Sequence, residues 1–192
     1  MNLAGGVSMA MYENDEIDIT GVGLADLERV KDPNDSLNKD LVNVPPQFSL
    51  NYIGFNVNMP PFDDVNFRKA LSYAVDKEII ADKIYSGLTK PSYSIIPPGF
   101  PGYSPSIKGI EFNEELAKEY LSKSKYSDLS SRPRIIVTIP GTGGSPGLDT
   151  EVISDMWKET LGVEVEIQQV EWATYLQDMN RKRLQLWSGS GW

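Results

Sequence analysis

The spacing of hydrophobic residues predicts a strand, a helix and a second strand in the last third of the chain. Residues 134–139 are rich in β-branched residues, as a buried strand is. Apolar side chains recur at helical spacing in residues 148–161, and they alternate with Glu and Gln in residues 163–170. This order is typical of a β-α-β unit, which predicts parallel strands joined by a right-handed crossover.

The same pattern predicts helices and shorter strands in the rest of the chain. Asp64, Asp76 and Asn113 each precede a helical pattern, and their side chains are suited to accept the free N–H groups of a first turn. Residues 88–112 contain five prolines and three glycines, which favours an irregular surface segment. Helices are expected over residues 3–12, 24–30, 65–75, 77–85, 114–122 and 173–181, and strands over 17–20, 41–44, 48–57 and 184–187. The fold class is therefore α/β.

The composition excludes several kinds of binding and catalytic site, but it says less about the fold. The 192 residues are 40% hydrophobic, which suits one domain or one large lobe with a core. A net charge of -9 disfavours binding to nucleic-acid phosphates. The absence of Cys and His removes disulfides, thiolate metal sites and the commonest general base. We therefore expect no cofactor and no metal site.

Neither a membrane span nor a secretion signal is expected within this chain. No stretch approaches the roughly 18 apolar residues that a spanning helix needs. The first residues lack a basic region followed by an apolar core. Either the protein stays in the cytosol, or an export signal lies outside these residues.

A glycine-rich loop at residues 140–147 raises the question of a nucleotide site. It lies between a predicted strand and a predicted helix, where dinucleotide-binding and P-loop proteins hold phosphates. The spacing departs from G-x-G-x-x-G, since Pro146 stands at the third glycine position, and there is no G-K-[ST]. A plain junction loop is the preferred interpretation. The alternative is a small nucleotide-binding domain or enzyme that uses this loop.

Tryptophans gather near the end of the chain. Trp157 lies on the apolar face of its predicted helix and is expected in the core. Trp172, Trp187 and Trp192 lie near the sequence Ser-Gly-Ser-Gly at residues 188–191, which is a poor core sequence. Cleft lining and core packing both remain open for these three side chains.

Several of these segments resemble the bacterial extracellular solute-binding protein family 5, which serves oligopeptide, dipeptide and nickel importers. The match keeps its order along nearly the whole chain, with Asp15 where the family usually has glycine. The segments are Y-E-N-D-E-I-D-I at residues 12–19, G-F-N at 54–56, P-P-F-D-D-V at 60–65, R-K-A-L-S-Y-A-V-D-K at 68–77, P-P-G at 97–99, E-W at 171–172 and G-W at 191–192. The resemblance implies a lobe of a type II periplasmic binding protein, with a mixed sheet flanked by helices.

Family members are longer than this chain and have two lobes. By resemblance, residues 1–192 form part of the second lobe, with the first lobe, an opening strand and the C-terminal return absent. The implied function is that of a non-enzymatic substrate-binding component of an ABC importer that captures a small solute, with a peptide favoured. The parent would be a periplasmic or extracellular lipoprotein that delivers its ligand to a permease. A signalling receptor built on the same lobe is a further alternative.

The resemblance also implies a ligand site. Trp172 and Trp192 would line the cleft, near the backbone of Gly189, Ser190 and Gly191 and a strand end at Thr20 and Gly21. Residues 60–77 would have structural roles. The isolated lobe is expected to bind its solute weakly or not at all, and its uncovered sheet edge favours self-association.

Overall fold

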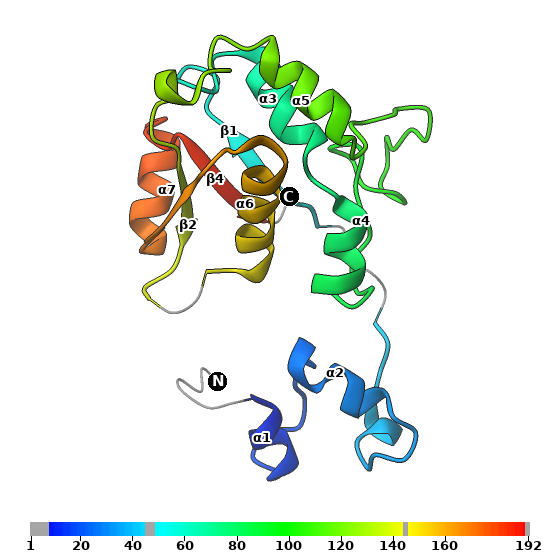
Figure 1. Ribbon diagram of the computed structural model, residues 1–192. Coiled ribbons are helices and arrows are strands. Elements are labelled where there is room, and N and C mark those ends of the chain that lie inside the picture. Colours follow the sequence, from blue (N-terminus) through cyan, green and yellow to red (C-terminus); the bar gives the residue numbers. More distant parts are fainter. Residues whose placement is uncertain (1–7, 45–48, 144–145, 191–192) are drawn as a thin grey trace. The chain divides into compact units, whose positions relative to one another are not determined.

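The structure is a computed structural model that describes residues 8–44, 49–143 and 146–190 (Figure 1). The chain divides into two units, residues 1–47 and residues 48–192, which are described separately.

The first unit consists of short helices. They are α1 (Ser8–Glu13), α2 (Leu24–Lys31) and the 3-10 helix η1 (Asn38–Asp40). Met9, Leu27 and Val30 are buried, and an ion pair of 2.5 Å between Arg29 Nη1 and Glu13 Oε1 joins α2 to α1. The helix expected from residue 24 is confirmed, and α1 agrees with the helix expected from residue 3 over its described part.

The prediction of two strands in this unit is wrong. Residues 17–20 and 41–44 form no strand, and Ile19, Val42 and Val44 are 87%, 76% and 75% exposed. A strand needs a neighbour to take up its N–H and C=O groups, and the described residues of this unit contain no strand. Alternation of apolar and polar residues was therefore a misleading signal here.

The second unit is built on a four-stranded mixed sheet. Its strands are β1 (Asn51–Phe55), β2 (Ile136–Pro140), β3 (Glu166–Val170) and β4 (Leu186–Ser190), in the order β1-β4-β2-β3. The central strand β2 is parallel to both β3 and β4, and β1 is antiparallel to β4. The parallel pair of the predicted β-α-β unit is confirmed, as is the mixed sheet.

Three helix starts follow the predicted capping residues. The helices are α3 (Val65–Tyr73), α4 (Lys77–Ile79), which continues as the π-helical turn η2 (Ile80–Ile84), and α5 (Glu114–Ser122). Asp64, Asp76 and Asn113 accept first-turn N–H groups at 2.7 to 3.4 Å. Ile79, expected to face inward, is 47% exposed, and Ala81 is instead the buried residue of this helical segment.

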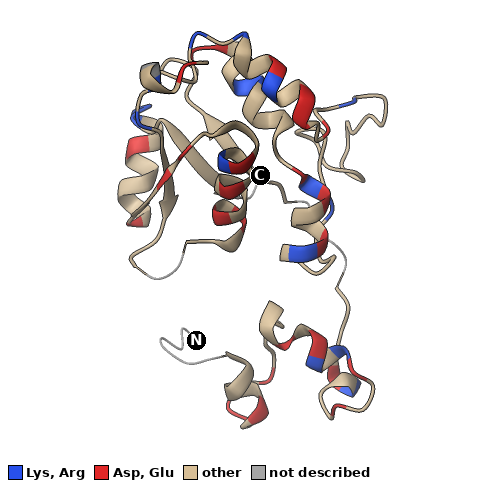
Figure 2. Ribbon diagram, viewed as in Figure 1, with Lys and Arg blue, Asp and Glu red and all other residues tan. Residues whose placement is uncertain are grey.

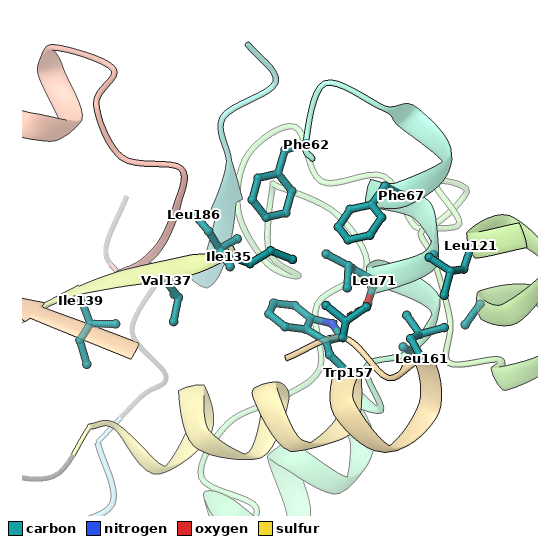
Figure 3. Packing of buried hydrophobic residues seen from close by; sticks show 14 residues of the cluster. Phe62, Phe67, Leu71, Leu121, Ile135, Val137, Ile139, Trp157, Leu161 and Leu186 are labelled. Carbon is teal, nitrogen blue, oxygen red and sulfur yellow. Dashed lines mark hydrogen bonds between the residues drawn. The ribbon is translucent and has the colours of Figure 1, made fainter. Parts of the chain in front are cut away.

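Helices cover both faces of the sheet (Figure 1). The helix α6 (Leu148–Leu161) lies over the face that carries Val137 and Leu186, and α7 (Trp172–Asn180) lies over the other. Trp157 of α6 is 2% exposed, as expected, and lies between the sheet and α3 (Figure 3). Its Nε1 donates to the carbonyl oxygen of Leu71 at 2.9 Å.

The long segment over residues 88–112 is irregular, as expected, and is held at its base by Lys77. The Lys77 ammonium donates to the carbonyl oxygens of Ser92 and Ile110, both at 3.2 Å, and lies 4.7 Å from the centre of the Tyr93 ring. Burial lowers the pKa of Lys77. Lys77, one of the residues 60–77 expected to have structural roles, thus binds both ends of this irregular segment.

Candidate functional site

One edge of the sheet gathers most of the predicted site. The parallel strands β2, β3 and β4 end at Pro140, Val170 and Ser190, and the antiparallel β1 begins beside them at Asn51, which pairs with Ser190. We call these four strand ends the carboxyl edge of the sheet. Ligands of open α/β sheets bind outside the carboxyl ends of the strands, so this edge is the candidate site.

Trp172 presents an aromatic surface at the carboxyl edge. It is the first residue of α7 and is 57% exposed. Its ring stacks on that of Tyr175, with 5.8 Å between the ring centroids and 15° between the ring planes. The Tyr175 hydroxyl donates to the carbonyl oxygen of Ser188 at 2.6 Å. An exposed indole is thus fixed to β4 through a buried tyrosine.

The hydroxyl of Tyr175 remains protonated far into the alkaline range. Burial, and then the nearby Tyr52, raise the pKa of Tyr175 to about 12. The side chain of Glu171 caps α7 by accepting N–H groups from Ala173 at 2.8 Å and Thr174 at 3.2 Å. The start of α7, and with it Trp172, is therefore held from two sides.

Two glycine–aromatic pairs fix β1 against β4. Gly189 pairs with Tyr52, and Gly54 pairs with Trp187. A Cβ atom at Gly189 would lie 2.6 Å from Tyr52 Cζ, and one at Gly54 would lie 2.3 Å from Trp187 Cε2. Each ring therefore lies directly over the glycine of the neighbouring strand. Gly189 is required here for packing as well as for an accessible backbone.

Trp187 packs away from the candidate site. It contributes to a hollow of about 210 Å³ at the opposite end of β1 and β4. Its buried Nε1 has no hydrogen-bond partner among the described residues. The hollow is lined by Phe55, Asn56, Val57, Met179, Lys182, Leu184 and Trp187. Of the two alternatives left open for Trp187, cleft lining and core packing, the structure thus favours packing, against the neighbouring strand.

Two backbone N–H groups of the glycine-rich loop donate hydrogen bonds to β3. Gly141 N donates to the carbonyl oxygen of Val170 at 2.8 Å, and Gly143 N donates to Gln169 Oε1 at 3.1 Å. Residues 144–145 lie outside the described part of the chain. Two N–H groups that a phosphate would need are therefore occupied by β3, which favours a junction loop over a nucleotide site.

A tyrosine–aspartate pair lies beside this loop. Tyr85 Oη donates to Asp149 Oδ2 at 2.9 Å, which links the end of η2 to the first turn of α6. Burial and then Asp149 raise the pKa of Tyr85 to about 12, and a side-chain hydrogen bond with Asn51 opposes them. Because Asn51 starts β1, its effect on the pKa of Tyr85 places the pair near the carboxyl edge.

The predicted site residues have three different outcomes. Trp172, Gly189 and Ser190 lie at the carboxyl edge, while Gly191 and Trp192 lie outside the described residues. Thr20 and Gly21 belong to the first unit, in a segment that forms no strand. Sequence reasoning missed Tyr52, Tyr175, Tyr85 and Asp149; only Tyr175 had a local signal, since it lies three positions after Trp172 on one helix face.

The described residues contain no group of three or more Asp, Glu, His or Cys that could hold a metal ion. Within the same residues, no helix has the length and apolar character of a membrane span.

Comparison with known proteins identifies the family. The sequence model for bacterial extracellular solute-binding proteins, family 5 (middle part), matches residues 5–192. The chain belongs to this family. This family 5 chain is 30% identical over 191 residues to the oligopeptide-binding protein OppA of Bacillus subtilis, covering 94% of the chain and 34% of that relative. It is 34% identical over 158 residues to the dipeptide-binding protein DppE of the same organism, covering 78% of the chain and 28% of the relative.

Solved structures agree with the family fold. A periplasmic oligopeptide-binding protein of Borrelia burgdorferi superposes on this family 5 chain with a TM-score of 0.78 at 25% identity, covering 95% of the chain and 35% of that structure. The murein tripeptide-binding protein MppA of Escherichia coli gives a TM-score of 0.78 at 26% identity, covering 95% of the chain and 36% of the structure. The chain thus spans about a third of the length of its relatives.

Proposed function

We propose that residues 1–192 are part of the second lobe of a two-lobe solute-binding protein that captures a peptide for an ABC importer. The observation that carries this proposal is the exposed Trp172 ring, fixed through Tyr175 beside the last residues of β4. The names of the relatives support a peptide as ligand, since they include oligopeptide-binding and dipeptide-binding proteins.

The carboxyl edge suits a ligand whose side chains vary. An aromatic surface at Trp172 offers flat apolar contact to many side chains, and backbone groups near Gly189 and Ser190 offer hydrogen bonds to a peptide main chain. Ligand contacts of Gly191, Trp192, Thr20 and Gly21 are proposed from the family resemblance alone. Closure of a first lobe over this edge would exclude water and strengthen those bonds.

Capture and delivery need no bond to be made or broken, so the proposed role is not enzymatic. It fits a chain without His or Cys. In this proposal the parent is a periplasmic or extracellular, membrane-anchored lipoprotein that hands its ligand to a permease.

Peptide titration of the 192-residue chain tests the proposal. We expect the Trp172 and Gly189 NMR signals to shift with a Kd weaker than micromolar, because half of the contacts would belong to the other lobe. Trp172→Ala should abolish the shifts at Gly189. Leu176→Ala, a change at another exposed residue of α7 (38% exposed), should leave them.

Several results would count against this function. A micromolar Kd for the chain alone would contradict the one-lobe assignment, and the absence of any shift at millimolar peptide would contradict peptide binding. Protection from thermal unfolding by NAD or ATP would instead support a nucleotide site. Reading the gene on both sides should reveal a first lobe and an export signal upstream, whereas a true start at Met1 and a stop after Trp192 would contradict the lobe assignment.

A further inference from the structure

One stretch of the chain differs in charge from the rest. Residues 83–110, which we call the basic segment, contain Lys83, Lys90 and Lys108 and no acidic residue, although the whole chain has 27 acidic residues and a net charge of -9. All three lysines are exposed. None of them forms an ion pair among the described residues. The basic segment therefore carries a net charge of +3 that the described part of the chain does not neutralise.

The basic segment also exposes large apolar side chains. Ile95, Ile107 and Leu88 are 73%, 56% and 55% exposed, and Tyr103 is 37% exposed. Figure 2 shows the irregular part of this segment in tan and blue beside α3 and α5. Single exposed apolar residues are ordinary, whereas several within one loop are typical of an interaction surface. Positive charge and apolar surface thus occur together here.

Local contacts hold this loop in a defined shape. Backbone hydrogen bonds of 3.0 to 3.2 Å close three successive turns, over residues 97–100, 100–103 and 104–107. At the base, a Cβ atom at Gly109 would lie 2.1 Å from the carbonyl oxygen of Tyr93, so the two arms of the loop are in close contact. A loop that is already ordered loses little conformational entropy when it binds.

We propose that the basic segment is a contact site for an anionic lipid surface. Lys83, Lys90 and Lys108 lie near the phosphate groups of the lipids, and Ile95 and Ile107 enter the boundary between headgroups and acyl chains. Such a surface accounts for both features, because its headgroups attract the lysines and its acyl chains accept the apolar side chains. The inference is independent of peptide binding at the carboxyl edge.

Sedimentation with lipid vesicles tests this proposal on the 192-residue chain. The chain is mixed either with vesicles of equal parts phosphatidylglycerol and phosphatidylcholine or with vesicles of phosphatidylcholine alone. Partition into the anionic vesicles should be roughly a hundredfold stronger, about fivefold for each lysine that approaches the surface. High salt should weaken it, because salt screens the attraction between exposed charges.

A charge-matched pair of variants shows whether the lysines act locally. Lys90→Gln combined with Lys108→Gln should weaken partition into the anionic vesicles by about 25-fold. Lys31→Gln combined with Lys39→Gln makes the same change in net charge at exposed positions of the first unit, and should leave the partition nearly unchanged.

A second pair of variants tests the apolar contact. Ile95→Ser combined with Ile107→Ser should weaken the partition at least tenfold, because two exposed side chains no longer leave water on binding. Val42→Ser combined with Val44→Ser changes residues of the first unit that are 76% and 75% exposed, and should have little effect. The amide spectrum of each variant shows whether it is folded.

Three results would overturn the proposal. The first is a chain that does not sediment with anionic vesicles, or sediments equally with both kinds. The second is an equal loss of partition in the basic-segment variants and in their controls, which would indicate a general effect of charge or hydrophobicity. The third is a dimer in sedimentation velocity without lipid that Ile95→Ser combined with Ile107→Ser dissociates, which would assign the loop to an interface between two copies of the chain.

Discussion

Asp64 connects two segments that lie 60 positions apart, and its replacement gives the sharpest test of the fold. Its Oδ1 accepts the N–H groups of Asn66 at 2.7 Å and Phe67 at 3.4 Å. Its Oδ2 accepts the Ser124 hydroxyl at 3.1 Å and the N–H of Lys125 at 2.8 Å. One carboxylate thus caps α3 and holds the chain that leaves α5. Asp64→Ala removes all four contacts.

The expected loss can be added up from these contacts. A helix cap contributes about 1 kcal/mol, and each of the two bonds toward Ser124 and Lys125 contributes about 1.5 kcal/mol because the acceptor is charged. Contacts of one side chain are not additive, and Asp64 is partly exposed, so the free energy of unfolding should fall by about 3 kcal/mol. Urea unfolding followed by tryptophan fluorescence measures it, since Trp157 is buried in the same unit.

The neighbouring acid provides the control. Asp63 bonds to Lys125 Nζ at 2.6 Å and to Tyr126 Oη at 2.8 Å on the exposed surface. Surface pairs of this kind contribute little to stability, so Asp63→Ala should unfold at nearly the same urea concentration as the parent chain. Equal effects of Asp63→Ala and Asp64→Ala would refute the capping argument.

Lowering the pH should remove the difference in free energy of unfolding between the parent chain and Asp64→Ala. Burial by itself would raise the pKa of Asp64, but hydrogen bonds from Lys125, Asn66, Ser124 and Phe67 together lower it below its usual value of 3.8. A carboxylate with a lowered pKa stabilises the fold above the unfolded-state value, and this stabilisation is lost as the pH falls through the folded-state value. A difference that persists unchanged at strongly acidic pH would contradict the role of the charge.

Two further results are expected. Gly54→Ala should destabilise the chain by more than about 2 kcal/mol, because the new methyl group would meet the Trp187 ring at 2.3 Å. Gly21→Ala is the control, since a methyl group there has open space and should leave the stability nearly unchanged. Equal urea midpoints for the two variants would argue against the close packing of Gly54 and Trp187. Tyr85, Tyr93 and Tyr175 have pKa values raised from 10 to about 12, so the stability that they contribute should be present below pH 10 and lost as the pH rises toward 12. Ultraviolet titration of tyrosinate, with a Tyr→Phe change at each position for assignment, should show three late-titrating phenols, and normal titration of Tyr85 and Tyr175 would contradict the burial of their hydroxyls.

Local features of the fold were predictable, because they depend on a few neighbouring residues. Asp64, Asp76 and Asn113 were identified as caps from position alone, since a helix needs acceptors for its first N–H groups. The strands expected at residues 17–20 and 41–44 failed because a strand also needs a partner, which no local pattern reports.

The candidate site was predictable only in part, for the same reason. The residue pattern left cleft lining and core packing open for Trp172, and only the family resemblance assigned it to the cleft. The contact of Tyr52 with Gly189 depends on the register of two strands that lie far apart in sequence. The contact of Tyr85 with Asp149 spans 64 positions and leaves no periodic signal. Pairings of this kind are fixed by tertiary structure.

The strand order has a consequence for how this chain is made. β4 is the last strand in sequence, yet it lies between β1 and β2. During synthesis β1 emerges early, and its partner strand in the described sheet is absent until residues 186–190 leave the ribosome. The first strand must therefore wait, unpaired, through about 130 residues of translation, a long interval in which a chaperone or another unpaired edge can bind it.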